Sequence, residues 1–458
     1  MLTYDMKERG KVPAYKYLYS CIKEDILNGN LLPDEKLPSK RSFATHLDVS
    51  VVTVMSAYEQ LISEGYIYSE PKKGYFVVPI LAQRKTEFPE ISNYKEEKPL
   101  RFDFSGNRLS GANFPFSVWS RLMRRVLLDY ENELLNPLPY NGAEILRKAI
   151  CQYLYHSSGM NVSPQQVIIG AGTEYLYMLI TQLVGKDKIL AVENPGYSKI
   201  SKIYRMNGIK TRCVGVDSKG LSAEALRKSN ADVVHISPSH HYPTGVVMPV
   251  DRQREILNWA DERGGYIIED DYDSEFRGFS QTNTLFNTDK NERVIYLNTF
   301  SKTIAPSMRI SYLILPSHLL EVYREKLNFL SCTVPSFEQY TLAMFINEGY
   351  FERHISRMKK HYQQCKAIVG DIIKNSAVGD KAEIVENVSG LHFIMKISTE
   401  KTDDEVVSAL KERGIGAKFL SQYMQNDTTG FQHQMIVNYG GFEIDKLKDA
   451  LKVLKEVI

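Results

Sequence analysis

NTFSKTIAPSMR, residues 298–309, directly follows the apolar run VIYL, which has the composition of a short β-strand. The lysine of this stretch, Lys302, therefore lies just beyond the end of a strand, which is where α/β sheets bind ligands. Thr299, Ser301 and Arg309 add two hydroxyl groups and a permanent cation near the lysine amine. This set suits a phosphorylated aldehyde, because the amine can form a Schiff base while the hydroxyls and the guanidinium hold the phosphate. A basic surface loop would be the better explanation if the stretch stood alone.

The composition limits the kind of protein. The chain has 458 residues, 43% of them hydrophobic and 24% charged, with a formal net charge of +2. This length allows more than one domain, and the charge balance alone says little about partners. No apolar run approaches the ~20 residues of a membrane helix, and the N-terminus lacks a secretory segment. We therefore expect no membrane binding. The cysteines are scattered without metal-ligand spacing, so we also expect a cytoplasmic protein without a metal site.

The chain divides into three zones. Residues 1–79 are typical of helices followed by a β-ribbon, residues 80–99 are polar and mixed in charge like a linker, and residues 100–458 alternate short strands with helices. This alternation predicts an α/β fold with a seven-stranded, mainly parallel sheet, followed from about residue 335 by a smaller C-terminal α+β subdomain. The expected strands are 167–169, 189–192, 212–216, 233–236, 266–268, 294–297 and 310–315, with 391–395 and 434–438 in the subdomain.

The first zone has the pattern of an α+β winged helix-turn-helix. One apolar face predicts a helix over 15–27, and Ser39 and Ser50 are placed to cap two short helices. Two strands, 66–68 and 75–78, would form a hairpin with a basic tip. In this motif the second helix of the pair enters the major groove of double-stranded DNA, while basic residues contact phosphates or the minor groove. The candidate DNA-binding residues are Ser39, Lys40, Arg41, Ser50, Thr53, Lys72, Lys73 and Gly74. The alternative is a helical substrate-binding or dimerisation domain with solvated lysines.

The segments LPSKR, VSVVTV and EGYI resemble the GntR family of bacterial regulators. The resemblance implies that Ser50 and Thr53 open the recognition helix and that Gly74 forms the tip of the wing. The chain departs from the family at Val51, where an arginine is usual. This departure removes a strong phosphate or guanine contact, which implies weaker binding or a different choice of sequence.

Two other strand ends carry groups that fit a phosphorylated aromatic ligand. GAGTE follows the strand at 167–169 and opens a helix, so backbone N–H groups at Gly172 and the hydroxyl of Thr173 form a phosphate cradle. ENPGY ends the next strand with Tyr197, whose ring can lie flat on a pyridine ring. Each signal is weak alone, because glycine and tyrosine are common in turns.

The order of these elements resembles fold-type I aminotransferases, which bind pyridoxal 5′-phosphate (PLP), over roughly residues 102–458. The resemblance implies a Schiff base between PLP and Lys302, a phosphate site completed by Thr299, Ser301 and Arg309, and a contact from Tyr140 across a dimer.

The run IIEDDYD places carboxylates at the end of another strand. A carboxylate against the pyridine nitrogen keeps that nitrogen protonated, which makes the ring an electron sink. We assign Asp270 to this role, with Asp271 as the alternative, and Tyr272 to the phenolate oxygen of the cofactor.

The run SHHYPTG resembles the Pro-Thr-Gly turn of the same family. An asparagine there usually contacts the phenolate oxygen, but this chain has Tyr242. The contact is therefore lost or made differently, with His240 or His241 as candidates. The alternative for two histidines in a turn is exposure to solvent.

A GntR-like domain joined to an aminotransferase-like domain resembles the MocR/GabR regulators over essentially the whole chain. The resemblance implies a transcriptional regulator that binds a DNA operator and senses a small-molecule effector, PLP or a PLP-reactive amine. It also implies a homodimer, commonly head-to-tail with exchanged DNA-binding domains.

Aminotransferases hold the substrate carboxylate with an arginine in a C-terminal strand. The matching run MIVNYG puts Ile436 at that position, although Arg413, Lys418 and Lys396 lie in the same subdomain. Loss of a bidentate contact to a carboxylate costs about ten- to a hundred-fold in affinity. The loss disfavours an amino-acid effector and favours PLP itself, as in the PdxR subgroup, which controls vitamin B6 synthesis. A PLP-dependent aminotransferase with a DNA-binding domain, and a regulator responding to an amino acid, are the alternatives.

Overall fold

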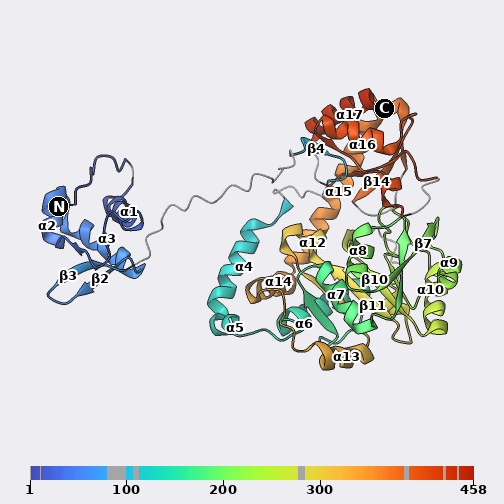
Figure 1. Ribbon diagram of the computed structural model, residues 1–458, viewed down its shortest axis with the longest axis horizontal. Coiled ribbons are helices and arrows are strands. Elements are labelled where there is room, and N and C mark those ends of the chain that lie inside the picture. The colour runs from blue at the N-terminus through green and yellow to red at the C-terminus, as the bar shows by residue number, and fades with distance from the viewer. Residues whose placement is uncertain are drawn as a thin grey trace. The chain divides into compact units, whose positions relative to one another are not determined.

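The computed structural model in Figure 1 describes residues 2–10, 12–79, 99–106, 113–276, 284–385, 391–425, 430–440 and 443–458. The chain separates into two compact units, Met1–Glu97 and Lys98–Ile458. Nearly all of the expected linker, at residues 80–98, lies outside the described residues.

The first unit contains three helices and a small sheet. The helices are α1 (Ala14–Leu27), α2 (Lys40–Leu47) and α3 (Val51–Ser63), and the sheet has β1 (Lys36–Leu37), β2 (Ile67–Glu70) and β3 (Gly74–Val77). The Ser39 side chain accepts a hydrogen bond from Ser42 N at 3.2 Å, and that of Ser50 accepts one from Thr53 N at 3.1 Å. These caps begin α2 and α3 where the sequence predicts. Strand β1, which pairs with β3, was not predicted, because two residues are too short to show alternation.

The second unit is built on a sheet ordered β5-β12-β11-β10-β9-β6-β7-β8. All seven predicted strands are present: β5 (Val167–Gly170), β6 (Ile189–Asn194), β7 (Lys210–Asp217), β9 (Val233–Ile236), β10 (Tyr266–Asp270), β11 (Val294–Thr299) and β12 (Ser311–Ile314). The predicted number of strands was too low by one, because β8 (Gly220–Leu221) folds back on β7 as a two-residue edge strand. Strand β12 is antiparallel to both of its neighbours, whereas β11, β10, β9, β6 and β7 run parallel.

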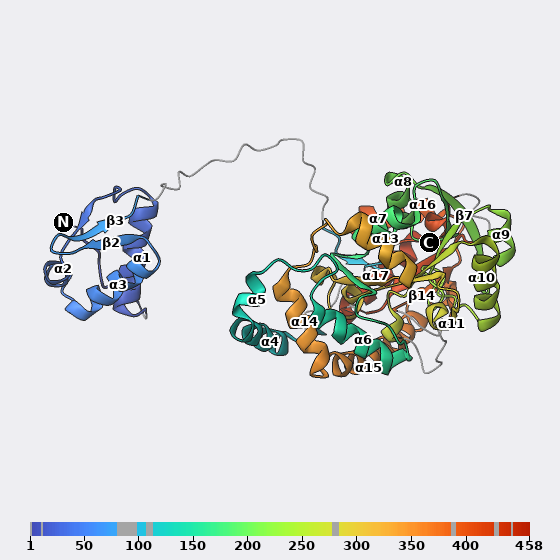
Figure 2. The ribbon, with the colours of Figure 1, turned by 90° about the horizontal axis from the view of Figure 1, so that it is seen from below.

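Helices cover both faces of this sheet, so β5, β9, β11 and β12 are buried on both sides. Ile168 packs with α7 (Thr173–Val184) and α13 (Ser317–Leu327), whereas Ile169 packs with α6 (Glu144–Ser158) and α14 (Ser336–Asn347). Figure 2 shows α7 and α13 on one side of the sheet and α6 on the other. The carboxyl ends of the parallel strands lie together at one edge of the sheet.

The C-terminal subdomain follows α15 (Tyr350–Lys374). Its antiparallel sheet is ordered β13-β14-β16, and its helices α16 (Asp403–Glu412) and α17 (Ile444–Val457) are red in Figure 1. The sequence predicted β14 (His392–Ile397) and β16 (Gln434–Asn438) but not β13 (Ala382–Val385). A short strand from the start of this unit, β4 (Phe102–Asp103), pairs with β15 (Ile415–Gly416).

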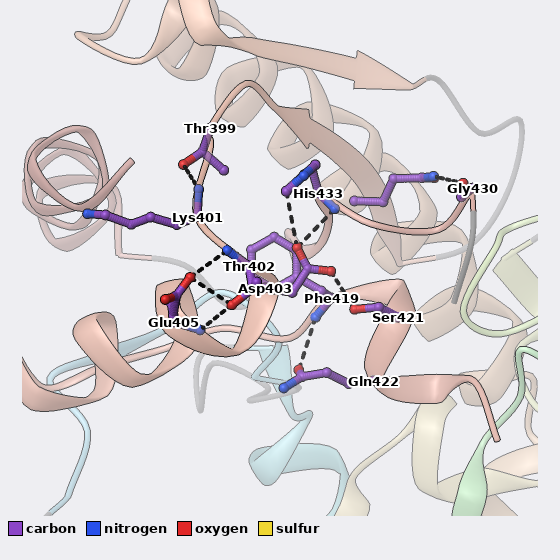
Figure 3. Close-up of polar contacts among 11 residues, drawn as sticks. Thr399, Lys401, Thr402, Asp403, Glu405, Phe419, Ser421, Gln422, Gly430 and His433 are labelled. Atoms are coloured by element: carbon purple, nitrogen blue, oxygen red, sulfur yellow. Dashed lines mark hydrogen bonds and ion pairs between the residues drawn. The ribbon is translucent and has the colours of Figure 1, made fainter. Parts of the chain in front are cut away.

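Asp403 joins three segments of this subdomain (Figure 3). It follows Thr402, which forms a capping box with Glu405 at the start of α16. One oxygen of the Asp403 carboxylate accepts a hydrogen bond from His433 N at 2.9 Å, and the other accepts one from Ser421 Oγ. Ser421 belongs to the 3-10 helix η5 (Leu420–Tyr423), so Asp403 fixes the segment that carries Tyr423.

Candidate functional site

A cavity of about 460 Å³ lies at the carboxyl ends of the large sheet and is closed on one side by the C-terminal subdomain. Such strand ends are the usual ligand site of α/β sheets. The predicted residues that line it are Thr173, Tyr197, Tyr242, Asp270, Tyr272, Thr299, Ser301, Lys302 and Arg309. Tyr140 does not line it, and its ring packs 5.4 Å from that of Tyr323. The predicted contact of Tyr140 across a dimer therefore stays a prediction.

Lys302 lies in α12 (Phe300–Thr303), the single turn that follows β11. The Thr299 side chain caps this turn by accepting a hydrogen bond from Ser301 N at 3.1 Å. The Lys302 amine lies 6.0 Å from the centre of the Tyr272 ring. Burial lowers the pKa of this amine, although the carboxylates of Asp273 and Asp270 act in the opposite direction. A neutral amine is the nucleophilic form that a Schiff base requires.

Asp270 ends β10 and presents one free oxygen at the cavity. Its Oδ2 accepts a hydrogen bond from the Tyr177 hydroxyl at 2.6 Å and lies 3.3 Å from His235 Nε2. Its Oδ1 is buried and has no hydrogen-bond partner among the described residues. Asp271 does not line the cavity, and its carboxylate accepts hydrogen bonds from Ser239 and from the Tyr296 hydroxyl. Of the two carboxylates left open by the sequence, the structure places Asp270 at the cavity.

The turn at Gly172 and the loop at Arg309 come together at one end of the cavity. Gly172 is not itself among the lining residues. Its φ of +90° favours glycine, and a Cβ atom there would lie 2.1 Å from a nitrogen of the flexible Arg309 side chain, so the two segments approach closely. Ser301 Oγ is buried without a hydrogen-bond partner in the described part of the chain. An unpaired hydroxyl and a guanidinium at a helix N-terminus suit a phosphate group.

The carboxylate of Glu174 lies at this same end of the cavity, which the sequence did not reveal. Its carboxylate accepts hydrogen bonds from Arg309 and from Lys199. Partial burial would raise the pKa of Glu174, but these two hydrogen bonds outweigh it and lower the pKa to about 2. The partners are distant in sequence, so only the fold shows that the predicted phosphate-binding arginine already has an internal anion.

His240 and His241 were wrong candidates for a contact in the cavity, and they are not exposed either. Both are 1% exposed and neither lines the cavity. His240 Nδ1 lies 2.8 Å from Asp273 Oδ2, and His241 Nδ1 lies 2.7 Å from Thr244 Oγ1. The hydroxyl of Tyr242 is instead 2.8 Å from that of Tyr423, and the Tyr272 hydroxyl donates to the His240 carbonyl at 3.1 Å.

The C-terminal strand presents Asn438, not Ile436, to the cavity. Ile436 is fully buried and packs with Ile394 and Leu420. Asn438, two residues further on, lines the cavity. Ile436 and Asn438 lie on the same face of β16, so the assignment of Ile436 to the arginine position stays a prediction. The cavity-facing residue of this strand is still not an arginine.

Lys418 is the one of the three alternative cations that lines the cavity, and Arg413 and Lys396 do not. Lys418 is also exposed to solvent. It therefore supplies a positive charge on the side of the C-terminal subdomain.

Glu193 is a second acid at the cavity, and the sequence did not reveal it. It lines the cavity, and its Oε2 accepts a hydrogen bond from Ser237 N at 3.1 Å. Its Oε1 is buried without a hydrogen-bond partner among the described residues. Burial, with a smaller contribution from the charge of Asp270, raises the pKa of Glu193 to about 8. Its place at the end of a predicted strand was a signal that could have found it.

The first unit places the candidate DNA-binding residues on its helices and wing. Arg41 and Lys72 are exposed, the Lys40 amine lies 5.2 Å from the centre of the Tyr75 ring, and Lys73 pairs with Glu70 at 2.8 Å. The turn of the wing is formed by residues 71–73, and Gly74 is the first residue of β3. The predicted tip of the wing was therefore placed slightly too late.

The described ranges contain neither a candidate metal site nor a candidate membrane span. No group of histidine, cysteine or acidic side chains there is arranged to hold a metal ion. No helix there is both long and apolar enough to cross a membrane.

Comparison with known proteins matches both units. Residues 102–418 match the family described as aminotransferase class I and II, and residues 14–77 match the bacterial regulatory proteins of the gntR family. The uncharacterized HTH-type transcriptional regulator YdeL of Bacillus subtilis is 34% identical over 97% of this chain and 96% of its own length. The HTH-type pyridoxine biosynthesis transcriptional regulator PdxR of Corynebacterium glutamicum is 28% identical over 95% of this chain and 94% of its own.

Among solved structures, an archaeal alanine:glyoxylate aminotransferase superposes with a TM-score of 0.69 at 19% identity, covering 78% of this chain and 90% of that one. The comparisons confirm both predicted folds, and the helical dimerisation domain that was the alternative for the first unit is excluded. The aminotransferase family match also supports PLP as the cofactor, and the unpaired Asp270 Oδ1 and Ser301 Oγ fit its ring nitrogen and its phosphate.

Proposed function

We propose that this chain, which belongs to the MocR-type HTH transcriptional regulators with a GntR helix-turn-helix and an aminotransferase-like domain, senses PLP in its cavity and changes its DNA binding in response. The observation that carries this proposal is the composition of the cavity. It has groups for every part of PLP, whereas the C-terminal strand offers Asn438 where a substrate carboxylate would need a cation.

Different residues of the cavity would bind different parts of PLP. Lys302 supplies the amine for the aldehyde, and Asp270 supplies the carboxylate for the ring nitrogen. Thr173, Thr299, Ser301 and Arg309, with the backbone of Gly172, would hold the phosphate. Tyr197 would pack against the ring, and Tyr242 and Tyr272 would lie on the side of the phenolate oxygen. Bound PLP would supply an electron sink. The chain's own residues bind and orient it, and Asp270 keeps a proton at the ring nitrogen.

The proposed regulator acts as a cytoplasmic homodimer, head-to-tail with exchanged DNA-binding domains, on a double-stranded DNA operator. The proposed targets are genes of vitamin B6 synthesis. Support comes from similarity over nearly the full length to PdxR, a relative named as a regulator of pyridoxine biosynthesis.

A second candidate effector is an amino acid or other PLP-reactive amine, and one observation favours it. Lys418 lines the cavity and brings a positive charge to the C-terminal subdomain side, where a ligand carboxylate would enter. If this candidate holds, or if the protein is an aminotransferase, an amino acid will change the absorption of the PLP-loaded protein, and Lys418→Ala will weaken that response.

The experiment that tests DNA binding uses the full chain and the promoter regions of its own and neighbouring genes. Arg41→Ala is expected to weaken binding to the operator by removing a contact near the recognition helix. Lys72→Ala is expected to weaken all sequences about equally and to lower the salt dependence, as for a phosphate contact. Absence of binding at low salt would contradict the proposed function.

A further inference from the structure

Helix α3 begins with two exposed aliphatic side chains. Val51 is 45% exposed and Val52 is 62% exposed, directly after the capping residue Ser50. The other face of α3 is buried through Val54 and Leu61. Neither valine belongs to the buried core of the unit, so both side chains are available for a contact outside it.

The surroundings of the valine pair suit the major groove of DNA. A recognition helix in this fold points its N-terminal residues at base edges. The first turn of α3 has no acidic residue, although acidic side chains are favoured there. Arg41 of α2 and Lys72 of the wing are exposed cations of the same unit, and they complement DNA phosphates. The exposed apolar pair therefore belongs to a surface whose charges match DNA.

We propose that Val51 and Val52 contact the 5-methyl groups of thymines, so that the operator carries A·T pairs at the positions that face the start of α3. This inference rests on the proposed DNA-binding function. Valine has no hydrogen-bond donor or acceptor and cannot read guanine or cytosine through their polar edges. The thymine methyl is the apolar feature of the major groove, and it distinguishes thymine from cytosine.

The chemistry of the valine side chain favours thymine over guanine. Valine in a helix is restricted to one preferred χ1 rotamer, so its two methyl groups are presented without a large loss of entropy. An arginine at residue 51 would pair with the O6 and N7 atoms of guanine. In this proposal an apolar contact with thymine replaces the arginine–guanine contact, and this replacement changes the preferred base.

The test begins with selection of binding sites by the full chain from a pool of random duplexes. Each thymine of the selected half-site is then replaced singly by deoxyuridine, which removes only the methyl group. Burial of one methyl group corresponds to about a fourfold change in affinity. Wild-type protein is expected to lose about that factor at one or two positions, and Val51→Ala and Val52→Ala are each expected to abolish the loss at one of them.

Ile62→Ala is the matched control, because Ile62 is a 38% exposed aliphatic residue at the other end of α3. It is expected to keep the deoxyuridine pattern of the wild type. Val51→Arg is expected to shift the selected base at one position to guanine.

Three results would overturn the inference while leaving DNA binding intact. The first is a selected half-site that contains no thymine. The second is an unchanged affinity for every deoxyuridine-substituted duplex. The third is a loss of affinity on deoxyuridine substitution that persists in both Val51→Ala and Val52→Ala. Failure of the full chain to select any sequence would overturn the proposed function as well.

Discussion

Tyr177 donates a hydrogen bond of 2.6 Å to one oxygen of Asp270, and the other oxygen of Asp270 is left buried and unpaired among the described residues. Tyr177 thus holds the carboxylate while leaving an acceptor for a ligand. We expect Asp270→Asn to weaken PLP binding about ten- to a hundred-fold, because a hydrogen bond to a charged group is lost. Titration of the apo-protein with PLP, followed by absorption, measures this.

Asp271→Asn is the matched control for that experiment. Asp271 is buried and accepts hydrogen bonds from Ser239 and Tyr296, so the substitution is expected to lower stability, by about 1–3 kcal/mol, with little change in PLP affinity. If Asp271→Asn weakened PLP binding more than Asp270→Asn, the two roles would have to be exchanged.

Lys302 is expected to be the lysine that carries the cofactor. Borohydride treatment of PLP-loaded protein should fix the cofactor to a peptide containing Lys302, and Lys302→Ala should lack the visible absorption band of the lysine-bound cofactor. Lys199→Ala is the control, because Lys199 also lines the cavity but is paired with Glu174. An unchanged band in Lys302→Ala would refute the assignment.

Arg309 is expected to recognise phosphate in competition with Glu174. Arg309→Ala should weaken PLP binding about ten- to a hundred-fold while leaving the affinity for pyridoxal, which has no phosphate, nearly unchanged. Glu174→Gln should strengthen PLP binding, because Arg309 no longer has an anionic partner inside the protein. Equal losses for PLP and pyridoxal in Arg309→Ala would place the phosphate elsewhere.

Glu193 is expected to make the stability of the apo-protein depend on pH. Its pKa is raised from 4.5 to about 8 in the folded state, so the folded state holds the proton more tightly than the unfolded state. The resulting stabilisation is complete below about pH 4.5 and is lost as pH rises to about 8. Glu193→Gln cannot lose a proton, so its stability relative to wild type should rise over this window, by at most about 1.4 kcal/mol per pH unit.

Urea unfolding followed by tryptophan fluorescence measures this difference. Both tryptophans, Trp119 and Trp259, lie in the second unit, so the signal reports that unit alone. A difference between wild type and Glu193→Gln that is constant from pH 5 to pH 8 would show that Glu193 titrates normally.

The site residues that lie at strand ends could be predicted from the sequence, because each of them ends or follows an apolar run that folds as a β-strand. Lys302 after β11 and Asp270 at the end of β10 are of this kind. Pairings between distant segments were not predictable, since the contact of Glu174 with Arg309 depends on how two separate loops meet. The sequence also did not show that Asn438, two residues beyond Ile436 in β16, lines the cavity. The burial of His240 and His241 depends on packing that turn composition does not reveal.

In the proposed function, one protein couples PLP binding to DNA binding. The most direct test is to measure the affinity of the full chain for its selected operator with and without PLP, and the affinity for PLP with and without the operator. We predict that PLP changes the operator affinity, that the operator changes PLP affinity by the same factor, and that Lys302→Ala reduces this factor. Rapid conversion of the bound cofactor to its pyridoxamine form by a common amino acid would favour the aminotransferase over the PLP sensor. An operator affinity that is identical with and without saturating PLP would contradict the coupling itself.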